Sequence, residues 1–112
     1  MIEEIILNYL SDNLSVFAYM EEPEKPPKEY ILIEKVGSSE SNCIRSAVIA
    51  VQSYSASLHG AAKLNDKVKR LMQNSVILDS IISCKLNSDY NYTDTETKRY
   101  RYQAVFDITF YD

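Results

Sequence analysis

Apolar and polar residues alternate most clearly over Arg99–Tyr111, near the end of the chain. One set of alternate positions is aromatic or apolar and consists of Tyr100, Tyr102, Ala104, Phe106, Ile108 and Phe110. The other set is mostly polar and begins with Arg99 and Arg101. Because successive side chains of a strand point to opposite faces, this pattern predicts a strand with one buried face and one solvated face.

Two segments have apolar residues at helical spacing. In the first segment these residues are Ile2, Ile5, Ile6, Tyr9 and Leu10, and the pattern weakens at Asp12. In the second, Ser55 or Ser57 can cap a helix that runs to about Gln73. Its expected buried stripe consists of Ala61, Leu64, Val68, Leu71 and Met72. The sequence therefore predicts two amphipathic helices.

Four further segments have the β-rich composition or alternation of strands. They are Val16–Met20, Tyr30–Val36, Asn42–Tyr54 and Ile81–Leu86. Gly37 and the serines after it are expected to close the second of these. At about 3.3 Å per residue, the third approaches or exceeds a length of about 40 Å. We therefore expect one end of that strand to project from the domain.

Two polar segments separate these elements. Glu21–Lys28 contains three prolines, which break a strand ladder, so it is expected to be a loop. Asn87–Lys98 is polar, has no glycine or proline, and is expected to form a long arm between the last two strands. The resulting order, α-β-β-β-α-β-β, predicts one α+β domain over residues 1–112. Its mainly antiparallel sheet would have about five strands, with two helices on one face.

Charge and cysteine content limit the environment of this domain. The 112 residues carry a net charge of −4, and the pI is near 5.0, which argues against clamping DNA or an anionic membrane. The sequence still allows a surface that DNA slides past. Cys43 and Cys84 lie in apolar runs and are expected to be buried free thiols, although a single disulfide remains open. Glu3 and Glu4 stand where a signal peptide needs positive charge, so we expect a soluble protein that is made in the cytosol.

The residues offer little material for catalysis. Two glycines cannot build a phosphate-binding loop, and the single histidine, His59, has no evident partner base or nucleophile. Asp89, Asp94 and Glu96 lack the glycine and terminal glutamate of a calcium loop. We therefore expect no catalytic residues, no metal and no cofactor.

The most promising candidates for a contact surface flank the last strand. Basic residues alternate with tyrosines there, and both tyrosine and arginine are enriched at protein interfaces. The candidate interface residues are Tyr90, Tyr92, Asp94, Lys98, Arg99 and Arg101. Tyr100 and Tyr102 fall on the apolar face and are expected to pack in the core. The same basic and aromatic residues could also grip a nucleic acid strand, although nearby carboxylates oppose this interpretation.

Several stretches together resemble one protein family. They are Pro26–Glu34 (PPKEYILIE), Ile49–Tyr54 (IAVQSY) followed by Ser57 and Ala61-Ala62, Leu86–Thr95 (LNSDYNYTDT) and Tyr100–Asp107 (YRYQAVFD). The chain resembles, from about Val16 onward, the small tail-completion proteins of long-tailed bacteriophages and of prophages in Gram-positive hosts. These are often labelled minor capsid or tail-component proteins and are similar to tail terminators.

The resemblance implies a structural virion protein and not an enzyme. Such a protein would be made in the host bacterial cytoplasm and assemble into a ring, commonly of six copies, in the virion tail. The ring would cap the tail tube, contact the head connector protein, and let DNA pass through its channel without specific binding; no membrane partner is implied. Two alternatives remain open: a head-side connector or adaptor, and a small nucleic-acid-binding domain.

Overall fold

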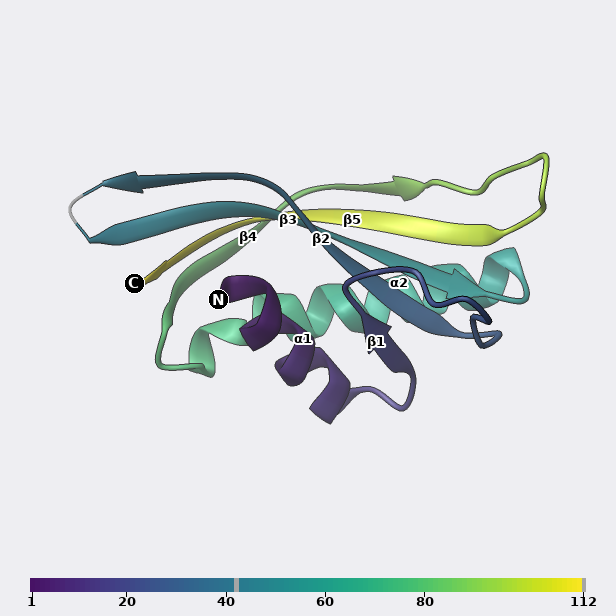
Figure 1. Ribbon diagram of the computed structural model, residues 1–112, viewed down its shortest axis with the longest axis horizontal. Coiled ribbons are helices and arrows are strands. Elements are labelled where there is room, and N and C mark those ends of the chain that lie inside the picture. The colour runs from purple at the N-terminus through teal and green to yellow at the C-terminus, as the bar shows by residue number, and fades with distance from the viewer. Residues whose placement is uncertain (42, 112) are drawn as a thin grey trace.

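Five strands form one sheet in the computed structural model, which describes residues 1–41 and 43–111 (Figure 1). The strands are β1 (Phe17–Tyr19), β2 (Tyr30–Ser41), β3 (Ile44–Ser55), β4 (Ile81–Asn91) and β5 (Tyr100–Tyr111), in the spatial order β1-β2-β3-β5-β4. The helical elements are α1 (Ile2–Asn13), α2 (Leu58–Gln73) and the short 3-10 turn η1 (Ser75–Ile77). All strand pairs are antiparallel except β1 with β2. The predicted α+β class, with helices on one face of a mainly antiparallel sheet, is confirmed.

The core lies between the two helices and one face of the sheet. Its strand residues include Ile31, Ile33, Ala47, Ile49, Val51, Ala104, Phe106, Ile108 and Phe110. Its helical residues include Ile2, Ile6, Tyr9, Leu10, Leu64, Val68 and Met72. The predicted alternation in β5 is confirmed, since its even-numbered residues from Ala104 to Phe110 are buried. Of the expected stripe on α2, only Leu71 is not fully buried.

Two side-chain hydrogen bonds explain where α2 begins and how α1 is attached to it. The side chain of Ser57 accepts a hydrogen bond from the backbone N–H of Gly60 at 3.0 Å, so Ser57, and not the other candidate Ser55, is the N-cap of α2. The Tyr9 hydroxyl of α1 donates to the carbonyl of Leu71 in α2 at 2.7 Å. This bond fixes α1 against α2 beneath the sheet.

β2 is longer than the sequence indicated. Gly37 was expected to close the strand, but β2 continues to Ser41 because β3 pairs with it as far as Ser41–Ile44. The pairing of β2 with β3 continues past a register shift between Lys35 and Gly37, as at a β-bulge. The far end of this hairpin extends past both helices in Figure 1, as expected for the long third strand. Asn42, where that strand was predicted to begin, lies outside the described residues.

The long arm predicted over Asn87–Lys98 is wrong. β4 runs through this region to Asn91, and its last residues pair with Gln103 and Tyr102 of β5. The remaining connection, residues 92–99, is closed by an antiparallel bridge between Asp94 and Arg99. The polar residues of this region are compatible with a strand, because one face of an antiparallel sheet can be exposed to solvent.

The two cysteines lie in different environments, and both are free thiols. Cys43 is exposed in the turn between β2 and β3, where its φ is 67°, so the expectation that it is buried is wrong. Cys84 is half-buried against the core, and burial raises the pKa of its thiol. No helix within residues 1–41 and 43–111 is long and apolar enough to cross a membrane.

We predict opposite outcomes for two phenylalanine substitutions. Phe106 is 0% exposed and Phe17 is 66% exposed. Phe106→Ala should lower the free energy of unfolding by about 3–5 kcal/mol, because it removes a buried ring and leaves a cavity. Phe17→Ala should change it by about 0.5 kcal/mol or less. Urea denaturation of both variants checks this, and equal losses would contradict the assignment of the core.

Candidate interaction surface

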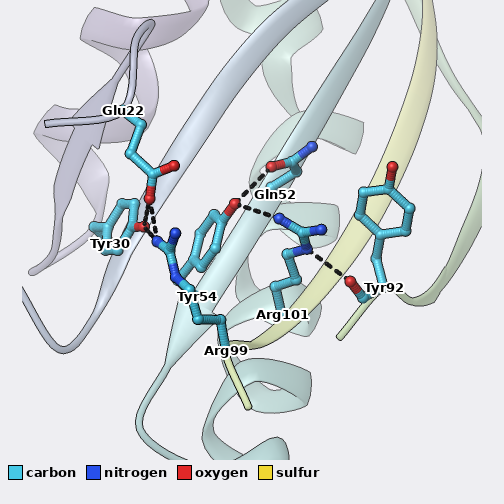
Figure 2. A network of polar contacts seen from close by, with 7 residues as sticks. All are labelled: Glu22, Tyr30, Gln52, Tyr54, Tyr92, Arg99 and Arg101. Atoms are coloured by element: carbon cyan, nitrogen blue, oxygen red, sulfur yellow. Dashed lines mark hydrogen bonds and ion pairs between the residues drawn. The ribbon is translucent and has the colours of Figure 1, made fainter. Parts of the chain in front are cut away.

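The face of the sheet that the helices leave uncovered carries a set of tyrosine, glutamine and arginine side chains. The strand register places them next to one another, since Tyr30 pairs with Tyr54, Tyr54 with Arg101, and Gln52 with Gln103. Figure 2 shows Tyr30 on β2, Gln52 and Tyr54 on β3, and Arg101 on β5, which are neighbouring strands. It also shows Glu22 in the loop before β2, and Tyr92 and Arg99 in the connection between β4 and β5. We call this face the open face.

Aromatic rings and guanidinium groups form a continuous row across the open face. We define the tyrosine–arginine row as Tyr19, Tyr30, Tyr54, Arg99, Arg101, Tyr92 and Tyr90. Tyr30 and Tyr54 stack with centroids 4.5 Å apart and ring planes 4° apart, and Tyr19 meets Tyr30 edge-on. The Arg101 guanidinium carbon lies 5.7 Å from the Tyr54 centroid and 4.5 Å from the Tyr92 centroid. Such ring and cation contacts give the row a fixed geometry.

A chain of hydrogen bonds runs beside these ring contacts. Arg101 Nη1 donates to the Tyr54 hydroxyl at 2.9 Å, and that hydroxyl donates to Gln52 Oε1 at 3.0 Å. Gln52 Nε2 then donates to Gln103 Oε1 at 2.8 Å, and Gln103 Nε2 donates to the Tyr90 hydroxyl. The Gln52 side chain is only 7% exposed. Its burial is tolerated because both the oxygen and the nitrogen of its amide group are hydrogen-bonded.

Glu22 ties the proline-containing loop to the row. Its carboxylate accepts hydrogen bonds from Arg99 and, at 2.8 Å, from the Tyr30 hydroxyl (Figure 2). The hydrogen bond from Arg99, and then the one from Tyr30, hold the pKa of Glu22 below its ordinary value. The same bond to Glu22 raises the pKa of Arg99. Burial, with the bond to Glu22, raises the pKa of Tyr30, so its hydroxyl stays protonated and keeps donating.

Exposure changes along the row. Tyr30 and Tyr54 are 2% and 3% exposed, whereas Tyr90 and Tyr92 are 41% and 42% exposed. Arg101 joins the two parts, because its Nε donates to the Tyr92 carbonyl at 2.6 Å while its Nη1 bonds Tyr54. The tyrosine–arginine row thus has two exposed tyrosines on the side of β4. Arg101 connects them to the buried Tyr54.

The structure brings together four of the six predicted interface residues: Tyr90, Tyr92, Arg99 and Arg101. Asp94 and Lys98 lie in the turn before β5. Asp94 accepts hydrogen bonds from the backbone N–H groups of Glu96 and Thr97, at 3.0 and 3.5 Å. The Thr97 side chain first, and then these backbone groups, lower the pKa of the Asp94 carboxyl by hydrogen bonding. Lys98 has a φ of 55°. These two residues shape the turn that leads into the row.

Sequence reasoning missed the other half of this surface. The missed residues are Glu22, Tyr30, Gln52, Tyr54 and Gln103. The tyrosines and glutamines occupy alternate positions of the predicted strands, but only the order and register of the strands show that they meet. Tyr100 and Tyr102 share the helix-facing side of β5 with Ala104, as expected. They are only half-buried and do not belong to the core, so the expectation that they pack there is wrong.

No group of three or more His, Cys, Asp or Glu side chains that could hold a metal ion occurs in the part of the chain that the structure describes. In comparisons with known proteins, no family model matches the chain and no curated protein shows significant sequence similarity to it.

The Glu22 contacts should stabilise the fold in a pH-dependent way. Because the pKa of Glu22 is lowered by folding, its contribution is present above the ordinary glutamate pKa of about 4.3 and is lost as pH falls through the lower folded value. Glu22→Gln should therefore lower the free energy of unfolding at pH 7 by about 1 kcal/mol or less, since the ion pair is partly exposed.

This difference between Glu22→Gln and the wild type should shrink below about pH 4. Denaturation curves at several pH values measure it. Glu24→Gln, an exposed change in the same loop, is the control and should show little difference at any pH. A difference that grows on acidification would refute the assigned role of Glu22.

Proposed function

We propose that this protein is a phage tail terminator: a structural virion protein whose copies form a ring that caps the tail tube and joins it to the head connector. The proposal starts from the resemblance of Pro26–Glu34, Leu86–Thr95 and Tyr100–Asp107 to tail-completion proteins. Its location would be the tail of the virion. In this role the protein makes and breaks no covalent bond.

One observation supports the proposal above the others: the tyrosine and arginine side chains of the open face are held in place by contacts within the chain, before any partner binds. Tyr54 and Arg101 are fixed by stacking and hydrogen bonds, and Tyr90 and Tyr92 are exposed beside them. A surface whose side chains are already ordered loses less conformational entropy on association. Tyrosine and arginine are also the residues that most often dominate binding between proteins.

The proposed mechanism is steric. A ring requires a heterologous interface, in which one patch of a subunit meets a different patch of the next. One face of the ring would match the last tube ring, and the other would offer no surface complementary to a further tube subunit. Polymerisation would stop for that reason, and the second face would be available to the head connector.

Net charge is compatible with passage of DNA through such a ring. The chain carries −4, and like charges on the protein would not retain the phosphate backbone. In this proposal DNA is a passing partner, without specific binding.

Tails assembled without this protein test the proposed role. Because nothing would stop polymerisation of the tube, we expect abnormally long tubes in electron micrographs, and normal lengths once the protein is supplied again. Tails of normal length that fail to join heads would contradict the terminator role and support a head-side connector.

Two tyrosine substitutions test the proposed contact surface. Tyr92 and Tyr111 are 42% and 58% exposed, so they form a matched pair. Tyr92 lies in the β4–β5 connection beside the first residues of β5, and Tyr111 is the last residue of β5. Tyr92→Ala should reduce the yield of complete tails at least fivefold in a complementation assay, and Tyr111→Ala should have a much smaller effect. Thermal unfolding should confirm that both variants fold. Equal yields would exclude Tyr92 from the contact.

A further inference from the structure

Two long stretches of sheet edge have no strand beside them among the described residues. β1 pairs with β2 only along Tyr30–Leu32, so the outer side of β2 from Glu34 to Ser41 borders no strand. β4 is the other edge strand and pairs only with β5. Such edges present backbone N–H and C=O groups that can pair with another chain.

The directions of these two strands are suited to joining copies of this chain. β2 and β5 run one way and β3 and β4 run the other, because each successive pair in this part of the sheet is antiparallel. A second copy rotated about an axis roughly parallel to the strands would bring its β2 beside the first copy's β4. The two strands would then be antiparallel, as in the rest of the sheet.

We propose that neighbouring copies in the ring join their sheets, with Glu34–Ser38 of one copy pairing antiparallel with Ile81–Lys85 of the next. This inference rests on the proposed function, because it names the contact that closes the ring. Glu34 of one copy would lie opposite Lys85 of its neighbour. The partner is thus a second copy of this chain, bound edge to edge.

Charge and position select this register. Glu34 pairs with Ala50 in the sheet, and Lys85 pairs with Asp107, so both side chains lie on the open face. Both residues are exposed. Placing them opposite one another makes a cross-strand pair of unlike charges, which stabilises a sheet, and slipping by one residue would send the two side chains to opposite faces.

Two exposed apolar residues come together in the same register. Val36 and Ile82 lie at register shifts of β2 and β4, and they are 56% and 38% exposed. With Glu34 opposite Lys85, Gly37 faces Ile82, and Val36 is the next residue along. The contact would therefore cover the exposed apolar side chains of Val36 and Ile82.

β4 has two register shifts against β5, and the one nearer its C-terminal end limits the length of the proposed contact. The register of β4 against β5 shifts between Leu86 and Ser88. In the neighbouring copy, the corresponding part of the β2 edge is occupied by β1, which pairs with Tyr30–Leu32. A bulge bends its strand, so β4 can turn away where β1 would block further pairing.

A charge exchange tests the inference. We expect Glu34→Lys and Lys85→Glu each to reduce the fraction of protein in rings at least fivefold, because each places like charges opposite one another. The double variant, Glu34→Lys with Lys85→Glu, should recover to within about twofold of wild type. Lys63→Glu, an exposed charge reversal on α2, is the control and should assemble normally. Rings are counted by electron microscopy after adding purified tail tube, and circular dichroism checks that each variant folds.

Amide hydrogen exchange gives a second measurement on the wild-type protein. When rings form, exchange should slow at least tenfold at those amides of Glu34–Ser38 and Ile82–Lys85 that point away from β3 and β5. The Ile81 amide already bonds to the Leu78 carbonyl and should change little. Rings without this protection, or a double variant no better than the singles, would overturn the edge pairing and leave the ring itself intact. A wild-type chain that never self-associates with the tube present would overturn both the pairing and the proposed function.

Discussion

The packing of α1 and α2 against a single face of the sheet is the constraint on which the other features of this structure depend. The helices bury the apolar sides of β2, β3 and β5, which supplies the main hydrophobic stabilisation of the fold. They are also shorter than the sheet they cover, so the far end of the β2–β3 hairpin extends beyond them (Figure 1). Everything proposed for assembly involves surface that this one-sided packing leaves uncovered.

The open face resolves a physical problem created by that arrangement. Polar side chains in the middle of a sheet are costly to bury unless they are hydrogen-bonded. Here Gln52 and Tyr54 satisfy each other and their neighbours, while stacking of Tyr30 on Tyr54 removes ring surface from water. Arg99 and Arg101 both lie over the Tyr54 ring, where their positive charges repel each other. The ion pair between Glu22 and Arg99 compensates one of the two charges. The result is a rigid polar and aromatic surface without a second helical layer.

Rigidity of this kind suits a protein that acts by shape. In the proposed ring, the exposed tyrosines of the row and the free edges of β2 and β4 would serve different contacts. The edges would bind copies of the chain to each other, and the row would meet the tube or the connector. Separating the two tasks in this way lets mutations at Lys85 and at Tyr92 report on different steps of assembly.

The sequence by itself determined the elements and the fold class, because those depend on local spacing, as in the helical stripe ending at Met72 and the alternation from Ala104 to Phe110. It offered Ser55 and Ser57 as caps of α2, and only the structure chose between them. The sequence misjudged the ends of β2 and β4, since a strand continues as long as a neighbouring strand offers partners, and those partners are distant in sequence. For the same reason it found Tyr90, Tyr92, Arg99 and Arg101 but missed Glu22, Tyr30 and Tyr54. Only the tertiary structure decided that these residues meet, because strand order and register bring together side chains that lie up to 77 positions apart.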